Sequence, residues 1–348
     1  MKRFDYSFLK NYELPSEFTT YSGALGELKA HAEWQKLQYP DVFTKMHEIA
    51  IVQSIKGSNA IEGIVASDER IKAIVNKGSE PLNHDEREIA GYKLALNEVH
   101  TRTSELDFRI NDIKDLHGLM VSLTNKRGGE FKESDNAIVE QYSDGTRKIR
   151  WETTSAKDTP FAMEQLYLAY IDARNDYSIN SILLIPCVIL DFLCIHPFSD
   201  GNGRMSRLLT LLLLYKSGYD VGRYISFEEQ INQNKGEYYE ALKASSTGWH
   251  ENRNSYLPFM RNFLSTLFMC YKELDKRFIT IDTQKAKKQE RITAAVMSSF
   301  IPLSKADIAS LVPDASVVTI EAVLGKLVKE GKIQKIGSGH ATKYIKSR

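Results

Sequence analysis

Cysteine is scarce in this sequence, and no apolar run is long enough to cross a membrane. The three cysteines, Cys187, Cys194 and Cys270, form no CxxC pair and no even-numbered framework, a pattern typical of a reducing cytoplasm rather than of a disulfide scaffold. The longest apolar stretch, Ser181 to Ile195, contains a proline and an aspartate and is too short to span a bilayer. The N-terminal MKRFDYSFLK carries charges where a signal peptide needs an apolar core. We therefore expect a cytoplasmic protein without a membrane partner.

A strong overall charge is also missing, but the charge is unevenly distributed. The 348 residues have a formal net charge of +1, with 42% hydrophobic and 26% charged residues, which is typical of a soluble protein of two or three domains. From Ile281 to Arg348 there are 12 Lys and Arg against 6 Asp and Glu, a balance of +6, which leaves −5 for the first 280 residues. A basic C-terminal region favours nucleic acid or an acidic protein as a partner.

Most of the chain has the apolar periodicity of α-helix. The segment from Pro40 to Gly63 has this spacing and ends at a glycine, the residue that favours the left-handed position after a helix. Ser67 is placed to cap the next helix, which has two acidic residues in its first turn. Further helices are predicted over about 85–102, 111–123, 161–175, 181–195, 204–217, 227–248 and 254–279.

Two segments depart from this helical pattern. Residues 128–154 contain an Asp144-Gly145 turn between two extended stretches, which predicts a β-hairpin that packs against the helices. After a lysine-rich linker at 280–290, the order changes to a helix, a short helix capped by Ser304, a third helix and two strands around a Gly-Ser-Gly wing. This order resembles a winged helix-turn-helix.

The stretch HPFSDGNGRMSR, from His196 to Arg207, is a polar loop between two apolar segments. Its glycines let backbone N–H groups approach a ligand, and the helix that begins near Arg204 adds its N-terminal dipole, so the loop predicts an anion site. Arg204 and Arg207 share one helical face, and their guanidinium groups suit phosphate oxygens. Asp200 can hold a hard cation such as Mg²⁺. His196 can accept a proton near neutral pH.

Two other kinds of site were weighed against this anion cradle. The sequence has no GxxxxGK[ST] phosphate-binding loop. Cys194, His196 and Asp200 are near enough in sequence to suggest zinc, but no second Cys or His pair has ligand spacing. A phosphate cradle with a metal ligand and a proton acceptor is therefore the preferred interpretation.

The loop matches every fixed position of HPFx[DE]GNGRxxR and thus resembles the signature of the Fic (Fic/Doc) family. The resemblance covers helical regions from about Lys36 to Ser265. It implies a mainly α protein with a Fic-type helical core, a β-hairpin flap and a small C-terminal winged helix-turn-helix domain. Family members typically transfer AMP from ATP to a hydroxyl side chain of a target protein. The domains expected are an N-terminal helical region at 1–104, a catalytic core at 105–279, the linker at 280–290 and the winged domain at 291–348.

The resemblance also implies roles for the loop residues. His196 would be the general base that deprotonates the target hydroxyl, and Asp200 would hold Mg²⁺ between the α- and β-phosphates of ATP. Asn202 would face the α-phosphate. The anion hole would consist of Gly201, Asn202 and Gly203. In chemistry of this kind, positioning and charge stabilisation provide most of the catalysis.

A second motif implies regulation. SNAIEG, from Ser58 to Gly63, is similar to the family's inhibitory helix motif [ST]xxxE[GN]. In this picture Arg204 clamps the β-phosphate and Arg207 binds the γ-phosphate. Glu62 would pair with Arg207 and block placement of the γ-phosphate, and an arginine–carboxylate pair is geometrically specific. In some relatives the equivalent glutamate also supports removal of AMP, where Glu62 would orient a water.

The hairpin and the segment from Glu237 to Leu242 also resemble parts of the family. The hairpin resembles the family's flap, which holds the target by strand addition, with residues 134–139 as its edge. Lys132 departs from the usual arginine-rich approach to the flap, and the turn is longer. EYYEAL, from Glu237 to Leu242, is similar to the segment that lines the adenine pocket, which makes Tyr239 a candidate nucleotide contact.

Three functions stay open at this point. The first is auto-inhibited protein adenylylation with ATP, Mg²⁺ and a target protein, which can be the protein itself. A homodimer is a further partner that this function allows. The second is de-AMPylation, or transfer of another nucleotide or phosphate-containing group, because the motif defines the phosphate cradle and not the base. The third is a nucleotide-sensing DNA-binding regulator that uses residues 291–348, although the third helix of that region begins DASVVTIEAV and has few base-reading side chains.

Overall fold

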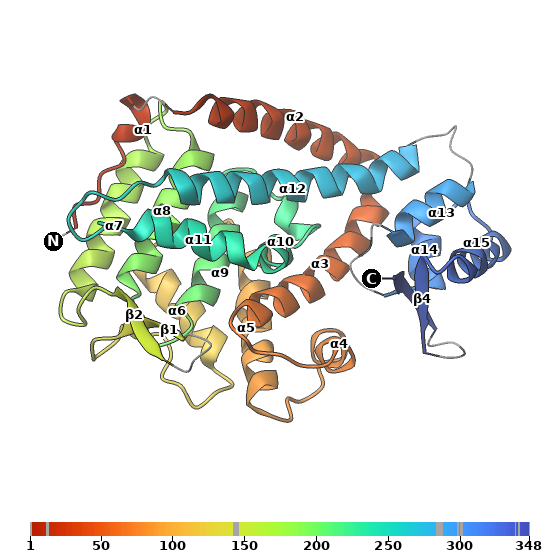
Figure 1. Cartoon of the computed structure of the whole chain (residues 1–348), viewed down its shortest axis with the longest axis horizontal. Helices are drawn as coiled ribbons and strands as arrows, with labels where there is room; N and C mark the ends of the chain where they lie inside the picture. The colour runs from red at the N-terminus through yellow and green to blue at the C-terminus, as the bar shows by residue number, and fades with distance from the viewer. Residues whose placement is uncertain are drawn as a thin grey trace.

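The computed structural model describes residues 2–11, 14–141, 146–282, 288–297, 299, 302–337, 339 and 342–347. It is mainly helical, as predicted (Figure 1). The first helices are α1 (Phe8–Asn11), α2 (Ser16–Gln38), α3 (Pro40–Ile61), α4 (Asp68–Lys77), α5 (His84–Thr101) and α6 (Ile110–Val121). A hairpin of β1 (Ala137–Gln141) and β2 (Arg147–Glu152) follows. The body continues with α7 (Thr159–Arg174), α8 (Ser181–Ile195), α9 (Asn202–Lys216), the 3-10 turn η1 (Val221–Arg223), α10 (Phe227–Gln233), α11 (Lys235–Ser246) and α12 (Leu257–Asp282).

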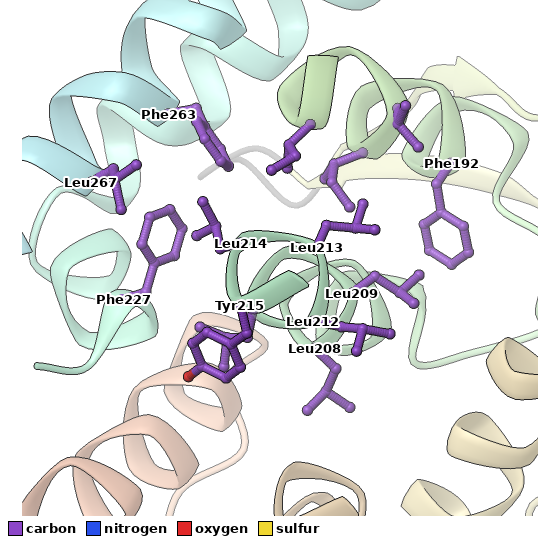
Figure 2. Close-up of a cluster of buried hydrophobic side chains, with 14 of the residues drawn as sticks. Phe192, Leu208, Leu209, Leu212, Leu213, Leu214, Tyr215, Phe227, Phe263 and Leu267 are labelled. Atoms are coloured by element: carbon purple, nitrogen blue, oxygen red, sulfur yellow. The ribbon is translucent and has the colours of Figure 1, made fainter. Parts of the chain in front are cut away.

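The centre of the body is α9, which is buried on nearly every side. A helix that is apolar all round must lie inside the protein, and Figure 2 shows the leucines of α9 surrounded by Phe192, Phe227, Phe263 and Leu267. Its main neighbours are α8, α5, α6 and α3. Full burial of one leucine contributes about 1.5–3 kcal/mol, so this core holds the start of α9, and with it the preceding loop, in a fixed place.

A buried carboxylate on α8 ties the N-terminal segment to the body. Asp191 is fully buried and accepts hydrogen bonds from Tyr6 Oη at 2.7 Å, Trp249 Nε1 at 2.6 Å and Tyr256 Oη at 2.9 Å. Burial raises the pKa of the Asp191 carboxyl, against the effect of these donors. The aspartate and the proline inside the apolar stretch thus do not interrupt α8, which is continuous from Ser181 to Ile195.

The hairpin lies against the body beside the end of α8. Its strands pair antiparallel, with Ala137 opposite Glu152 and a register shift between Ile138 and Val139. Trp151 Nε1 donates to Cys194 O at 3.0 Å, and the Trp151 ring stacks on His250 at 4.8 Å. The predicted Asp144-Gly145 turn lies outside the described residues.

The C-terminal region forms a second, smaller core. Its elements are α13 (Lys288–Met297), β3 (Leu303–Ser304), α14 (Lys305–Leu311), α15 (Val317–Lys329), β4 (Ile333–Ile336) and β5 (Lys343–Lys346). The strands form an antiparallel sheet in the order β3-β5-β4, and Ser304 caps α14 with a capping box, as expected. The order agrees with the one predicted for a winged helix, and the domain name stays a prediction. The expected linker is shorter than 280–290, because α12 continues to Asp282 and α13 begins at Lys288.

This domain touches the body at α3. Ile49 of α3 packs against the C-terminal core, and Lys45 lies 3.4 Å from Asp307 of α14. Figure 1 shows the domain at the end of the molecule where α3 begins. The domain therefore rests on the helix that carries the SNAIEG motif.

One predicted helix was wrong in its extent. The segment 227–248 is two helices, because the chain turns at Asn234, whose φ of −118° and ψ of 35° are not helical. Ser226 caps α10 by accepting from Glu229 N at 2.9 Å, and the break lets α10 pack on α3 while α11 packs on α12. Among the described residues, no helix has both the length and the apolar character of a membrane span.

Candidate functional site

The loop between α8 and α9 is held in a sharp turn. The chain leaves α8 at His196, which has a left-handed backbone (φ 55°, ψ 61°) and donates its N–H to Phe192 O at 3.0 Å. A positive φ at a residue other than glycine is rare and persists only where the surroundings enforce it. Phe198 is fully buried, and α9 begins after Gly201, which is also left-handed (φ 77°). The turn thus ends α8 at His196 and leads the chain into α9 within a few residues.

His196 is set up as a proton acceptor. Its Nδ1 lies 3.3 Å from Leu193 O, and a carbonyl oxygen can only accept, so Nδ1 carries the hydrogen and Nε2 keeps its lone pair. Burial lowers the pKa of His196 to about 4. The imidazole is therefore neutral near pH 7, with one nitrogen available to take a proton.

The anion-hole residues have different tasks. The Asn202 amide is fully buried, accepts from Phe198 N at 2.9 Å and donates to Phe198 O at 2.8 Å. Its side chain therefore closes the loop, and its place at an α-phosphate stays a prediction. Gly201 N donates to Asp200 Oδ1 at 2.7 Å. The N–H groups of the first turn of α9 are the donors that an anion would meet there.

A histidine of α6, outside the motif, also supports the loop. His117 on α6 accepts from Gly129 N at Nδ1, 3.1 Å away, so its Nε2 carries the hydrogen and donates to Asp200 O at 3.1 Å. The ring stacks on Phe198 at a centroid distance of 3.8 Å, and burial lowers its pKa to about 4. A neutral His117 thus orients the loop from a second helix.

Four charged side chains form an alternating chain beside the loop. Arg204 Nη1 donates to Glu88 Oε2, Lys126 Nζ donates to Glu88 Oε1, and Lys126 Nζ also donates to Asp200 Oδ2. The side chains of Glu88 and Arg204 are 0% and 2% exposed. Burial opposes the charge of Glu88, but its bonds to the two cations hold its pKa below the ordinary value. Arg204 Nε is buried and has no partner among the described residues.

The SNAIEG motif at the end of α3 lies against Arg207. Arg207 Nε donates to Ser58 Oγ at 2.9 Å, and its Nη2 donates to Ser58 O at 2.9 Å and to Glu62 Oε1 at 2.8 Å. Glu62 ends α3, and Gly63 follows in the left-handed conformation that stops the helix. The structure thus brings Ser58, Glu62 and Arg207 together, as the motif predicted.

The Glu62 carboxylate also covers the first turn of α9. A Cβ atom built on Gly203 would lie 2.3 Å from Glu62 Oε1 and 3.5 Å from Arg207 Nη1. Only a glycine leaves room for the carboxylate at this position. An acidic group therefore already occupies the place over the helix N-terminus where an anion would bind.

Tyr239 forms another wall of the site. Arg150 of the hairpin donates from Nη2 to Tyr239 O at 3.2 Å and lies 5.7 Å from the centre of its ring. Burial raises the pKa of the Tyr239 hydroxyl, and the Glu62 charge adds to this effect, so Tyr239 lies within electrostatic reach of Glu62. A role at the adenine stays a prediction.

Lys132 joins the hairpin to the loop. Its buried Nζ donates to Asn136 Oδ1 at 2.8 Å, Thr153 Oγ1 at 2.7 Å and Ile195 O at 3.3 Å. Burial lowers the pKa of Lys132 to about 8. The lysine that departs from the arginine-rich pattern therefore fixes both feet of the hairpin beside His196.

Asp200 is the carboxylate of the loop that fits a hard cation. Its side chain is 53% exposed, and a cation, the Lys126 ammonium, already lies on its Oδ2. The described residues contain no group of three or more His, Cys, Asp and Glu that could form a closed metal site. The donor set thus suits Mg²⁺ that arrives with substrate phosphates and keeps waters, and it does not suit structural zinc.

The C-terminal domain offers little to a DNA groove. Helix α15 begins with Val317 and Val318, which are 59% and 74% exposed. Lys305 pairs with Glu321, and Lys332 pairs with Glu330. Part of the +6 balance is therefore neutralised locally, and DNA binding stays a prediction without support from this helix.

The central part of the chain is similar to one known protein family. Residues 107–214 match the model of the Fic/DOC family. Proteins named protein adenylyltransferase Fic from Drosophila yakuba and Drosophila melanogaster are 25% and 24% identical over 166 residues. Each match covers 47% of this chain and 30% of the relative, so the chain spans less than a third of the length of these curated relatives.

Solved structures extend the likeness to the fold of nearly the whole chain. A Fic family protein from Desulfovibrio desulfuricans G20 superposes with a TM-score of 0.61 at 18% identity, over 97% of each chain. Fic-1 (residues 134–508 of that protein) from C. elegans superposes with a TM-score of 0.59 at 20% identity, over 77% of this chain and 76% of the other.

Proposed function

We propose that this chain, whose residues 107–214 form a domain of the Fic/DOC family, is an auto-inhibited protein adenylyltransferase that transfers AMP from ATP to a hydroxyl of a target protein. One arrangement carries the proposal. His196 keeps a lone pair on Nε2 in the loop that leads into α9, and Arg207 of α9 holds Glu62. A proton acceptor and an anion-binding helix end are thus adjacent, and an acidic side chain covers the second.

His196 would act on the target hydroxyl. Nε2 takes the hydroxyl proton while the oxygen forms a bond to the α-phosphorus of ATP, and the bond between this phosphorus and the α,β-bridging oxygen breaks. AMP is then linked to the target and pyrophosphate leaves. Because burial keeps His196 neutral, the acceptor form is present at neutral pH.

The remaining loop residues would hold the nucleotide. The N–H groups at the start of α9 and the unpartnered Nε of Arg204 are donors for phosphate oxygens. Asp200 would hold Mg²⁺ that enters with ATP. When bound, Mg²⁺ neutralises charge on the phosphates. Tyr239 and Arg150 would border the base, and the hairpin edge would take the target segment by strand addition.

Glu62 would keep the enzyme weakly active. Its carboxylate uses the Arg207 donor that a γ-phosphate would need and lies over Gly203. ATP must displace a charge-assisted hydrogen bond before its triphosphate fits productively. A change that removes this carboxylate is therefore expected to raise activity.

The test is incubation with radiolabelled ATP and Mg²⁺, followed by measurement of label on protein. We expect weak labelling by the wild type, at least about tenfold more by Glu62→Gly, since one charge-assisted hydrogen bond is removed, and none by His196→Ala in the Glu62→Gly background. His31→Ala, which changes a histidine of α2 that pairs with Asp275, is the matched control. Labelling that survives His196→Ala would rule out the mechanism.

De-AMPylation is the second candidate, and one observation favours it. The Glu62 carboxylate lies over Gly203 in the first turn of α9, and His196 is in the loop before that turn, so both groups could face the same water. An AMP-modified target should then lose AMP with the wild type and keep it with Glu62→Gly. Parallel labelling with UTP and GTP tests whether the base is selected.

A further inference from the structure

We propose that Lys126 is an internal counter-cation of Asp200, which Mg²⁺ must displace when it binds, so that Lys126 sets the Mg²⁺ concentration at which the site loads. This inference rests on the proposed nucleotide function for its purpose. The contact itself is a property of the chain without nucleotide. The Lys126 ammonium donates to Asp200 Oδ2, while the other carboxylate oxygen accepts from Gly201 N.

Lys126 is held at this position from the other side as well. It lies in the turn after α6, where its backbone N–H donates to Thr124 Oγ1 at 3.2 Å. Its ammonium also donates to Glu88, whose side chain is 0% exposed. Exposed ion pairs contribute little to stability because water competes for both partners. In this pair, however, Glu88 is fully buried. Lys126 is therefore anchored to the protein interior and reaches outward to Asp200.

The charges of the four side chains in this chain balance in pairs. Glu88 is already paired with the buried Arg204, so one cation compensates the buried carboxylate. The second cation, Lys126, then balances Asp200. Without nucleotide, the chain Arg204–Glu88–Lys126–Asp200 has no net charge. A divalent cation placed on Asp200 would meet the ammonium at the same oxygen, and like charges repel.

Two opposite effects follow from removing this ammonium. Mg²⁺ should bind Asp200 more tightly, because no cation competes with it. The metal-free nucleotide should bind more weakly, because its phosphates lose one positive charge nearby. If Lys126 had a purely structural role, its removal would weaken the binding of both Mg²⁺ and nucleotide, since a distorted loop holds neither ligand well. The opposite signs are thus the signature of an internal counter-cation.

The experiment uses the full chain and Mn²⁺ as a spectroscopic probe for Mg²⁺. Free Mn²⁺ is measured by electron paramagnetic resonance during titration of nucleotide-free protein, and metal-free ADP binding is measured by calorimetry with EDTA. We expect Lys126→Met to bind Mn²⁺ at least about tenfold more tightly than the wild type and ADP several-fold more weakly. Lys126→Arg, which keeps the charge, should stay near the wild type. Lys93→Met removes a lysine that donates to Ile74 O on α4 and controls for net charge.

The Mn²⁺ titration decides whether Lys126 is a counter-cation of Asp200. Equal or weaker Mn²⁺ binding by Lys126→Met, in protein that melts like the wild type, overturns the proposal. If Lys126→Met does not fold, Lys126→Gln is measured in its place with the same expectations. Because the Mn²⁺ titration needs no nucleotide, it answers the question about Lys126 even if labelling assays reject adenylylation. Conversely, labelling by Glu62→Gly with unchanged Mn²⁺ affinity in the lysine variants rejects only this inference.

Discussion

Two fully buried carboxylates, Asp191 and Glu88, are stabilised in contrasting ways. Asp191 accepts only from neutral donors, the hydroxyls of two tyrosines and an indole N–H. Glu88 accepts from the cations Arg204 and Lys126, and His84 Nε2 lies 3.4 Å from its Oε1. The first carboxylate joins the N-terminal segment to α8, and the second lies behind the phosphate loop. Their pKa values accordingly shift in opposite directions, upward for Asp191 through burial and downward for Glu88 through its ion pairs.

This difference means that the hydrogen bonds of Asp191 form a fixed joint between the N-terminal segment and α8, whereas the ion pairs of Glu88 can exchange partners. Tyr6 and Trp249, two of the donors to Asp191, are enclosed by the core, so the Asp191 cluster can only be made or broken. Cations beside an open loop can change partners when an anion or a metal enters. The comparison predicts that changes at Asp191 act on stability, whereas changes at Glu88 act on ligand binding as well.

The largest effect on stability is expected from Asp191→Ala. It leaves two buried donors, Tyr6 and Trp249, without an acceptor, and each orphaned group costs about 1–3 kcal/mol, so the free energy of unfolding should fall by at least about 2 kcal/mol. Urea denaturation followed by circular dichroism measures this. The folded fraction should label as the wild type does. A variant as stable as the wild type would contradict the idea of a fixed joint.

Glu88→Gln should have a smaller effect on stability and a clear effect on the site. The amide still accepts from Arg204 but no longer balances its charge, so we expect a loss of about 1–3 kcal/mol in the free energy of unfolding. Labelling in the Glu62→Gly background should fall about 10- to 100-fold, as is typical when the partner that orients a ligand-binding group is removed. Unchanged labelling would place Glu88 with Asp191 as a purely structural group.

The two carboxylates should also respond to pH with opposite sign. Glu88 has a lowered pKa, so it adds stability above its ordinary value of 4.5 and loses that contribution as the pH falls through its folded pKa. Asp191 has a raised pKa, so its contribution is present below 3.8 and is lost as the pH rises through its folded pKa. Denaturation between pH 3 and 8 should therefore show a flatter acid limb in Glu88→Gln than in Asp191→Asn. Identical slopes would argue against the contrast.

The smallest effect is expected from Tyr256→Phe. This change removes one of the three donors to Asp191 and leaves the ring, which stacks on Phe8 at 5.3 Å. One buried hydrogen bond contributes about 1 kcal/mol, so a loss of that size is expected in the same urea experiment. A loss as large as that of Asp191→Ala would mean that a single donor dominates the joint.

The local patterns of the sequence predicted the parts of the site that are local in the chain. The loop from His196 to Arg207, the end of α3 at Gly63 and the cap at Ser67 all follow from residue types at fixed spacing. The pairing of Glu62 with Arg207, over 145 positions, was expected only because the resemblance implied it. Physical reading of either segment alone gives no reason for their contact.

Residues that support the site from other helices could not be found in this way. Glu88, His117 and Lys126 look like ordinary helix and turn residues until folding brings α5 and α6 beside the loop. A buried glutamate on an otherwise apolar helix face was the available signal. Helix α2 also escaped prediction, because its buried positions, such as Phe18 and Leu25, are far apart among small and polar residues.

Helix α3 contacts two separate parts of the molecule, the C-terminal core at Ile49 and Arg207 at Glu62. Ile49 and Glu62 are 13 positions apart, which spans about 20 Å at 1.5 Å per residue. A tilt of ~5° about the Ile49 contact would displace Glu62 by ~1.7 Å, which takes a 2.8 Å hydrogen bond beyond its working range. Helix α3 thus joins the Glu62–Arg207 contact to the C-terminal core, and a tilt this small is enough to break that hydrogen bond.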